Sequence, residues 1–294
     1  MGFSVARRAR RWPDGSGVAP LANALVRNPP EAATLEVTLL GPELEFDDER
    51  VVAVTGAQFD VLLDGRTMPP NAPFIVSAGA RLRFGVRRAG ARAYVAISGG
   101  IATPLTLGSR ATHLISGAGG MHGRALVAGD VLPLGAPNDV YGAVSLPQSS
   151  VIALPDHHAR VRVLPGPQSE YFAADALEVL QSAPYTIAQN SDRMGFRLQG
   201  PPLSHVRGAD IISDATPLGV LQVPASGEPI LLMADRQTAG GYPKIATVIA
   251  ADIPVAGQLG PGDAISFVVC TAREAVAALI ALERTLMSVE AGHV

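Results

Sequence analysis

Short apolar runs closed by glycine and proline turns recur about every ten residues along the chain, a pattern typical of β structure. Several of these runs are rich in β-branched residues, which fit a pleated surface. We predict strands at 51–55, 74–77, 81–86, 94–98, 151–154, 160–164, 230–234, 244–250 and 264–269. Helices are few, and we predict them at 18–27, 169–181 and 272–288. Thr271 and Glu274 have the spacing of a capping box at the start of the last helix, which we expect to pack one apolar stripe on a β core.

A turn glycine followed by a strand recurs around Gly79, Gly129 and Gly262, and this suggests two related halves that meet near residues 135–155. Regularly spaced strands must close their edges, and barrels do so more fully than sandwiches. We therefore predict a mainly β protein of two β-barrel domains with a few short helices. The predicted domains are 1–140 and 141–294, the second ending in the C-terminal helix.

Composition excludes several classes of protein. The 294 residues are 48% hydrophobic and 17% charged with a net charge of −3, which excludes a disordered chain and a nucleic-acid-binding one. One cysteine, Cys270, excludes an intramolecular disulfide framework and suits a reducing compartment. The arginine-rich start has no apolar segment after it, and no run is long and apolar enough for a bilayer. We expect a cytoplasmic protein without nucleic-acid or membrane partners.

Two segments interrupt the β pattern with clustered polar chemistry. Arginine can clamp a carboxylate or phosphate, amide side chains can pair with an amide, and a Gly-Gly turn lets backbone N–H groups approach an oxyanion. Ordinary loop charges and a hairpin turn explain the same residues about equally well. The candidate residues are Gln189, Ser191, Asp192 and Arg193 in the first segment, and Asp235, Arg236, Gln237, Thr238, Gly240, Gly241, Tyr242 and Lys244 in the second.

Lys244 is the only lysine among 23 basic side chains. A compact ammonium has a tunable pKa that arginine lacks, which favours a function for it after the Gly-rich turn, although codon bias could also leave one lysine. A Gly-rich stretch earlier in the chain could cradle an anion through Ser109, Arg110, Thr112 and Arg124, but a plain long loop is the favoured interpretation. No Walker-type motif and no metal-ligand spacing occur in the sequence, so we expect no metal site.

The run from Asp235 to Lys244, Asp-Arg-Gln-Thr-x-Gly-Gly-Tyr-Pro-Lys, resembles the carboxyltransferase-like family, as do 98–101, 108–112, 123–126 and 189–198. That family includes the C subunit of 5-oxoprolinase (the KipA-like proteins), allophanate hydrolase subunit 2 and the carboxyltransferase domain of biotin-dependent urea carboxylase. The resemblance implies two cyclophilin-like β-barrels and a KipI-like B subunit as partner. It also leads us to expect that the first family strand, with the segment after it, is missing or replaced here. Asp192 stands where asparagine is common.

The resemblance implies the C subunit of an ATP-dependent 5-oxoprolinase, which opens 5-oxoproline to glutamate with B and A subunits and uses ATP at the level of the complex. In this hypothesis Arg193 or Arg236 binds the substrate carboxylate or a phosphate. Lys244 and the Gly240–Gly241 backbone stabilise charge on the amide oxygen, and Asp235 orients Lys244 or accepts a proton from water. Gln189, Ser191 and Gln237 align the lactam amide.

Two alternatives stay open. The first is transfer of a carboxyl group from carboxybiotin to a urea-like amide, with the biotin on another polypeptide because this chain lacks a Met-Lys acceptor pair. The second is a regulatory protein that binds a KipI-like inhibitor of a kinase.

Overall fold

The computed structural model describes residues 4–6, 18–138 and 154–290. Its contacts divide the chain into two compact units. Within the described residues, the N-terminal unit holds 4–6, 18–138, 154 and 285–290, and the C-terminal unit holds 155–284. The domain boundary predicted between residues 140 and 141 lies outside the described residues, as do 151–153 of one predicted strand.

The N-terminal unit is built on one seven-stranded antiparallel sheet. Its order is β1-β2-β7-β4-β5, with β3 paired to β7 and β6 paired to β4. A short strand, β1, is present near the start of the chain, where we expected the first strand to be missing or replaced. The strands are β1 (Ser4–Ala6), β2 (Thr34–Thr38), β3 (Glu43–Glu45), β4 (Arg50–Leu63), β5 (Arg66–Thr67), β6 (Pro73–Val76) and β7 (Arg81–Ile97).

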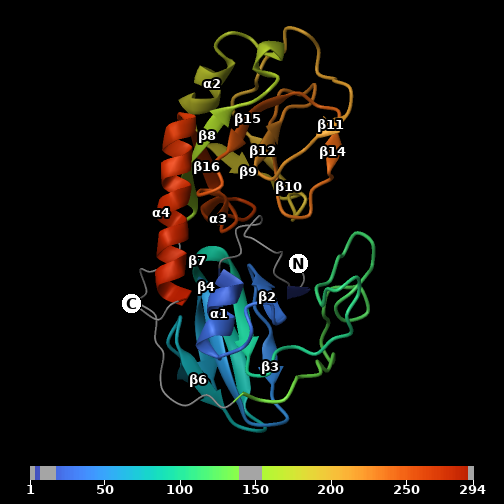
Figure 1. Ribbon diagram of the computed structural model, residues 1–294, viewed down its shortest axis with the longest axis vertical. Helices are drawn as coiled ribbons and strands as arrows, with labels where there is room; N and C mark the ends of the chain where they lie inside the picture. Colours follow the sequence, from blue (N-terminus) through green and yellow to red (C-terminus); the bar gives the residue numbers. More distant parts are fainter. Residues whose placement is uncertain (1–3, 7–17, 139–153, 291–294) are drawn as a thin grey trace. The chain divides into compact units, whose positions relative to one another are not determined.

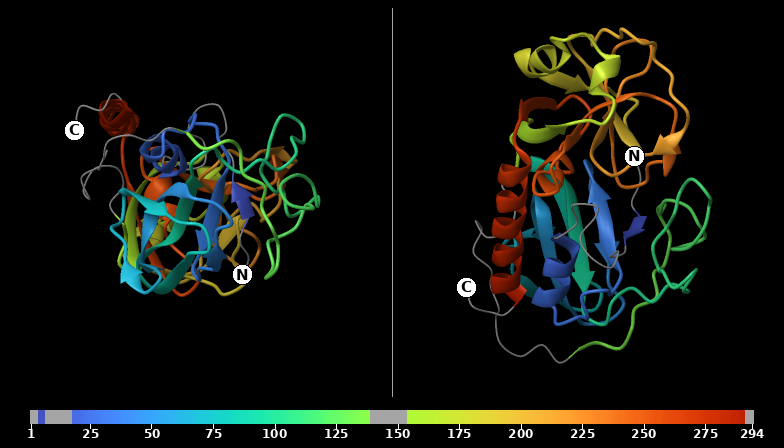
Figure 2. Two further views of the ribbon diagram at one scale, coloured as in Figure 1. Left: turned by 90° about the horizontal axis from the view of Figure 1, so that it is seen from below. Right: turned by 45° about the horizontal axis from the view of Figure 1, so that its top comes forward.

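Alternation along β4 separates two apolar layers of the N-terminal unit. Val52 and Val54 join the main core on one face of the sheet. Ala53, between them, packs on the other face with the helix α1 (Val18–Leu25). Figures 1 and 2 show α1 lying against this sheet. Successive side chains of a strand point to opposite faces, so one apolar run serves both layers. The helix ends two residues before the predicted end, at Leu25.

The C-terminal unit is a closed barrel in the order β10-β13-β12-β15-β8-β16-β9. Its core includes the fully buried Val161, Tyr185, Leu198 and Ile245. All neighbouring pairs are antiparallel except β8 with β16, which run parallel. The strands are β8 (His158–Pro165), β9 (Tyr185–Ile187), β10 (Gly195–Gln199), β12 (Val220–Gln222), β13 (Ile230–Leu232), β15 (Lys244–Val248) and β16 (Ala264–Val269). A mainly β fold with few helices is confirmed.

A two-stranded ribbon and the remaining helices complete the structure. The ribbon pairs β11 (Asp214–Ala215) with β14 (Ala239–Gly240). The prediction of a single helix at 169–181 is wrong. The structure has two separate elements there, a 3₁₀ turn, η1 (Ser169–Tyr171), and the helix α2 (Ala176–Ser182). A four-residue helix, α3 (Ile253–Ala256), follows β15.

The last helix is α4 (Ala272–Glu290), and its capping box is confirmed. Glu274 Oε2 accepts hydrogen bonds from Thr271 N and Oγ1, and Thr271 Oγ1 accepts one from Glu274 N. Its apolar stripe is more open than we expected, because Val276 is 57% and Ile280 47% exposed. Among the helices of the described residues, none is long and apolar enough to cross a membrane.

Candidate functional site

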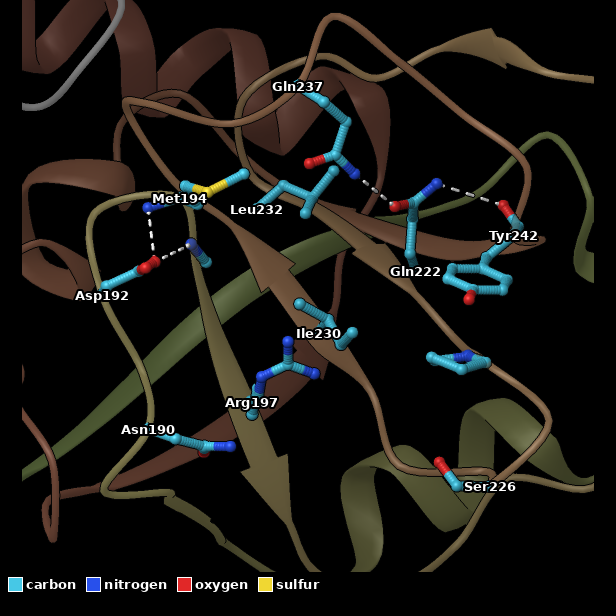
Figure 3. A pocket seen from close by; sticks show the side chains of 12 residues that line it. Asn190, Asp192, Met194, Arg197, Gln222, Ser226, Ile230, Leu232, Gln237 and Tyr242 are labelled. Atoms are coloured by element: carbon cyan, nitrogen blue, oxygen red, sulfur yellow. Dashed lines mark hydrogen bonds between the residues drawn. The ribbon is translucent and has the colours of Figure 1, made fainter. Parts of the chain in front are cut away.

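A pocket of about 400 Å³ lies in the C-terminal unit, between the barrel strands β10, β12 and β13 and the loops beside them: the loop before β10 and the loops after β12 and β13. Strand alternation decides which side chains reach it: Arg197 on β10 and Ile230 on β13 line the pocket, whereas Leu198 and Leu231 enter the core. Figure 3 shows the side chains that line the pocket, with Arg197 and Ile230 among them. The lining residues are Asn190, Asp192, Met194, Gly195, Arg197, Gln222, Pro224, Ser226, Ile230, Leu232, Gln237 and Tyr242.

One wall of the pocket is built from amide groups. Gln237 Nε2 donates to Gln222 Oε1 at 3.3 Å, and Gln222 Nε2 donates to the Tyr242 carbonyl oxygen, also at 3.3 Å (Figure 3). Gln222 is 1% exposed although it is polar, so these bonds are what satisfy its amide. We call Gln222, Gln237 and Tyr242 the amide wall.

The loop that leads into β10 is held by its own polar side chains. Asp192 Oδ1 accepts hydrogen bonds from Met194 N at 2.8 Å and Gly195 N at 3.3 Å. Ser191 Oγ accepts one from Arg197 N at 3.0 Å. These contacts are local turn chemistry of the kind that short polar side chains provide. Ser191 therefore supports the position of Arg197 rather than lining the pocket itself.

Asp235 binds an arginine instead of the lysine that we expected it to orient. Arg193 Nε donates to Asp235 Oδ2 at 3.0 Å. Arg236 Nε donates to the Thr216 carbonyl oxygen at 2.8 Å. Neither arginine is among the lining residues, so in this structure both connect loops beside the pocket.

Lys244 is 2% exposed and is also absent from the pocket lining. Its Nζ donates to Asp214 Oδ2 at 2.6 Å and to the Ala215 carbonyl oxygen at 3.1 Å. The hydrogen bond from Lys244 holds the pKa of the Asp214 carboxyl below its usual range, with help from a backbone N–H of Ala215. The carboxylate that orients Lys244 is therefore Asp214, thirty positions earlier in the chain.

The other predicted residues of the two segments lie around the pocket without lining it. Gln189 is exposed, and the Thr238 carbonyl accepts a hydrogen bond from Thr216 N at 3.0 Å. Gly240 and Gly241 both have ordinary backbone conformations, since neither is among the residues of positive φ. Gly240 instead matters for space, because a Cβ there would lie 2.7 Å from Gln222 Nε2.

The predicted anion loop belongs to the N-terminal unit, and its side chains bind within that unit. Arg124 makes a two-pronged ion pair with Asp130, at 2.7 and 2.8 Å. Arg110 Nη1 donates to the Thr103 carbonyl, and Ser109 Oγ accepts from Ala111 N at 3.1 Å. The Thr112 hydroxyl is buried without a hydrogen-bond partner in the described part of the chain. Both arginines thus have protein partners here.

Sequence reasoning missed several lining residues. Arg197 was inside the matching segment, but only the alternation of β10 reveals that it faces the pocket. Gln222 had a detectable signal, since a lone amide interrupts the apolar run 220–223. Pro224 and Ser226 carry no signal that distinguishes them from other loop residues.

The lining combines one guanidinium, one carboxylate, several amides and apolar side chains from Met194, Ile230 and Leu232. Such a pocket suits a small polar molecule that presents an anionic group and an amide, within the range of about 300–1,000 Å³ usual for small-ligand sites. A single cation among these twelve lining residues does not fit a triphosphate. In the described residues, no group of three or more histidine, cysteine or acidic side chains could hold a metal ion.

The sequence of the chain is similar to those of known proteins. Residues 16–269 match the family described as "Carboxyltransferase domain, subdomain A and B". The chain is 38% identical to the C subunit of the 5-oxoprolinase of Escherichia coli over 259 residues, which cover 88% of this chain and 82% of that protein.

Two solved structures extend the comparison to the fold. The crystal structure of the K. lactis urea amidolyase matches with a TM-score of 0.88 and 28% identity over 98% of this chain. The crystal structure of TTHA0988 matches with a TM-score of 0.79 and 37% identity over 91% of this chain. This chain spans 19% of the urea amidolyase and 54% of TTHA0988.

Proposed function

Because the chain belongs to the family of carboxyltransferase domains, subdomains A and B, we propose that it is the C subunit of an ATP-dependent 5-oxoprolinase in the cytoplasm. In this proposal it opens 5-oxoproline to glutamate only together with a KipI-like B subunit and an A subunit. The similarity to the E. coli protein over most of both chains supports the assignment.

The observation that carries the proposal is the pairing of Arg197 with the amide wall in one pocket. 5-Oxoproline has a carboxylate and a lactam amide on one five-membered ring. Arg197 can bind the carboxylate through two N–H groups. Gln222 and Gln237 offer the donors and acceptors that the lactam N–H and C=O require, and the ring carbons would pack on Ile230 and Leu232.

Polarisation of the lactam carbonyl is the step that these residues would assist. An amide donor of the wall, aimed at the oxygen, would stabilise negative charge that develops there when water attacks. The pocket does not fit ATP, so we assign nucleotide binding to another part of the complex and take no step through it. The roles first expected of Lys244, Asp235 and Arg236 would then be indirect, through the loops that they connect.

The direct test is co-expression of the chain with its B-like and A-like partners, followed by an assay for ATP-dependent glutamate release from 5-oxoproline. Arg197→Gln should raise the KM for 5-oxoproline about 10- to 100-fold, because a hydrogen-bonded charge is worth about 1.5–3 kcal/mol. Arg160→Gln, a change of an exposed arginine on β8 outside the lining, is the matched control. A well-folded complex of all three proteins that releases no glutamate would contradict the proposal.

A second candidate is carboxyl transfer to a urea-like amide, because the urea amidolyase fold matches nearly the whole chain. Urea offers amide groups to Gln222 and Gln237 but has no carboxylate for Arg197. Under this alternative, biotin is carried by another polypeptide and Arg197→Gln leaves the KM for the amide substrate nearly unchanged. Complex formation with a KipI-like partner without any ATP use would favour the regulatory alternative instead.

A further inference from the structure

The burial of Lys244 requires a partner, and that partner is a half-exposed carboxylate. The Lys244 side chain is 2% exposed and the Asp214 side chain 53%. An ammonium removed from water is strongly unfavourable unless it is paired and hydrogen-bonded. Asp214 and the Ala215 carbonyl provide that pairing at 2.6 and 3.1 Å. The contact therefore fixes an outer segment of the chain to the first residue of barrel strand β15.

That outer segment, residues 211–216, we call the strap. It binds the loop 236–241 along its length. Ile211 N donates to the Gly241 carbonyl at 2.8 Å, and Thr216 N donates to the Thr238 carbonyl at 3.0 Å. Between these bonds, β11 of the strap pairs with β14 of the loop. The Thr216 hydroxyl also donates to the Gln237 carbonyl.

The loop held by the strap contains Gln237 of the amide wall and leads directly to Tyr242. Gln237 belongs to it and Tyr242 follows it directly, and both bind Gln222. Gly240 of β14 lies so close to Gln222 that a Cβ would come within 2.7 Å of Nε2. A shift of the loop would therefore move the donors and acceptors that face the pocket.

We propose that Asp214 and Lys244 are positioning residues: their ion pair fastens the strap, and the strap fixes the amide wall for substrate. This role rests on the proposed function for the ligand used in its test. Neither side chain touches substrate in this proposal, because neither lines the pocket. The lone lysine of the chain thus acts on substrate affinity through Gln237 and Gln222.

The kinetic test uses the full chain assembled with its partners and carrying Asp214→Asn or Lys244→Met. Asp210→Asn is the matched control, because Asp210 is an exposed carboxylate just before the strap. We expect both test variants to raise the KM for 5-oxoproline about five- to twentyfold, while kcat changes by less than about twofold. The double variant should be no worse than the worse single one, since both changes break the same bond.

The second readout needs no substrate. Hydrogen exchange at the amides of Ile211 and Thr216 should become faster in Asp214→Asn and Lys244→Met, and stay unchanged in Asp210→Asn. Lys244→Met replaces the buried ammonium by an apolar side chain and leaves only the half-exposed Asp214 without its partner, so this variant should keep the barrel folded, which thermal unfolding would verify.

The outcomes separate this role from the proposed function. Unchanged exchange in both test variants overturns the positioning role, and so does a loss of kcat in Lys244→Met with an unaltered strap, which would make Lys244 a catalytic residue. Faster exchange in both variants of a complex whose wild type releases no glutamate supports the positioning role and contradicts the proposed substrate.

Discussion

Replacement of Gly240 by alanine tests how tightly the amide wall is packed. Gly240 does not need a left-handed backbone, since its φ is not positive. It needs room, because an added Cβ would lie 2.7 Å from Gln222 Nε2 and 3.1 Å from Thr216 Cγ2. The methyl group must therefore displace Gln222 or separate the two strands of the ribbon.

The size of the effect follows from these contacts. Carbon contacts are most favourable at about 3.5–4.0 Å, so the Gln222 amide has to move by roughly 1 Å. Gln222 is 1% exposed, and overpacking of such a site costs about 1–3 kcal/mol. Movement would also break its two 3.3 Å hydrogen bonds, each worth about 1 kcal/mol. We expect unfolding free energy to fall by about 2 kcal/mol and affinity for 5-oxoproline by about tenfold.

The assay combines urea unfolding of the full chain with titration calorimetry of 5-oxoproline against the assembled complex. Gly241→Ala is the matched control, because its Cβ would lie 3.4 Å from the Ile211 carbonyl and 3.8 Å from Ser213 Oγ, which are ordinary contacts. The reasoning is refuted if the two alanine variants lose the same affinity, or if Gly240→Ala binds as tightly as the wild type.

Three further predictions concern stability. Leu198→Ala removes a fully buried barrel side chain and should cost about 2–5 kcal/mol in urea unfolding, whereas the exposed Leu105 should tolerate alanine within about 0.5 kcal/mol. Burial raises the pKa of Tyr185 to about 12. The folded state therefore disfavours ionisation of this phenol, and the free energy of unfolding should fall as pH rises above about 10. Tyr185→Phe should remove this alkaline loss, and it should cost about 1 kcal/mol at pH 7 because the hydrogen bond from the Tyr185 hydroxyl to the Pro201 carbonyl is lost. The Arg124 guanidinium holds the pKa of Asp130 well below its usual range. This pair therefore stabilises its loop above about pH 4, and the contribution is lost as pH falls further. The protection factor of the Val127 amide against hydrogen exchange, which is corrected for the intrinsic pH dependence of exchange, should fall in acid in the wild type, and Asp130→Asn should lower it already at neutral pH.

The sequence allowed prediction of the strands wherever the apolar alternation is regular. The predicted strand 160–164 lies within two residues of the bounds of β8, and the predicted strand 264–269 has the bounds of β16. Prediction failed along β4, where the register against β7 shifts between Gly56 and Val61 and the period of two is lost. It also divided β7 into two strands, because Arg87, Arg88 and Gly90 interrupt the apolar run while the backbone stays paired with β4.

The site residues expected from the sequence stay predictions, and the structure shows only which of them line a pocket. Both segments singled out for their polar residues do flank the pocket, and Asp192, Gln237 and Tyr242 line it. Which side chains of a barrel strand face the core and which face the pocket depends on how the whole ring of strands closes. The sequence of a single segment does not reveal this. Long-range partners are equally hidden, so the ion pair of Lys244 with Asp214 had no local signal.

The one parallel pairing in the barrel has a consequence for synthesis of the protein. His158 on β8 lies opposite Ala264 on β16, so the ring closes only between strands about a hundred residues apart. During translation, the edge of β8 that pairs with β16 stays unpaired until β16 has left the ribosome. The strands of the N-terminal sheet all lie between Ser4 and Ile97 and can pair while the second half is still being made. Contacts of long sequence separation form slowly, so we expect the C-terminal barrel to be the part of the nascent chain most dependent on chaperones.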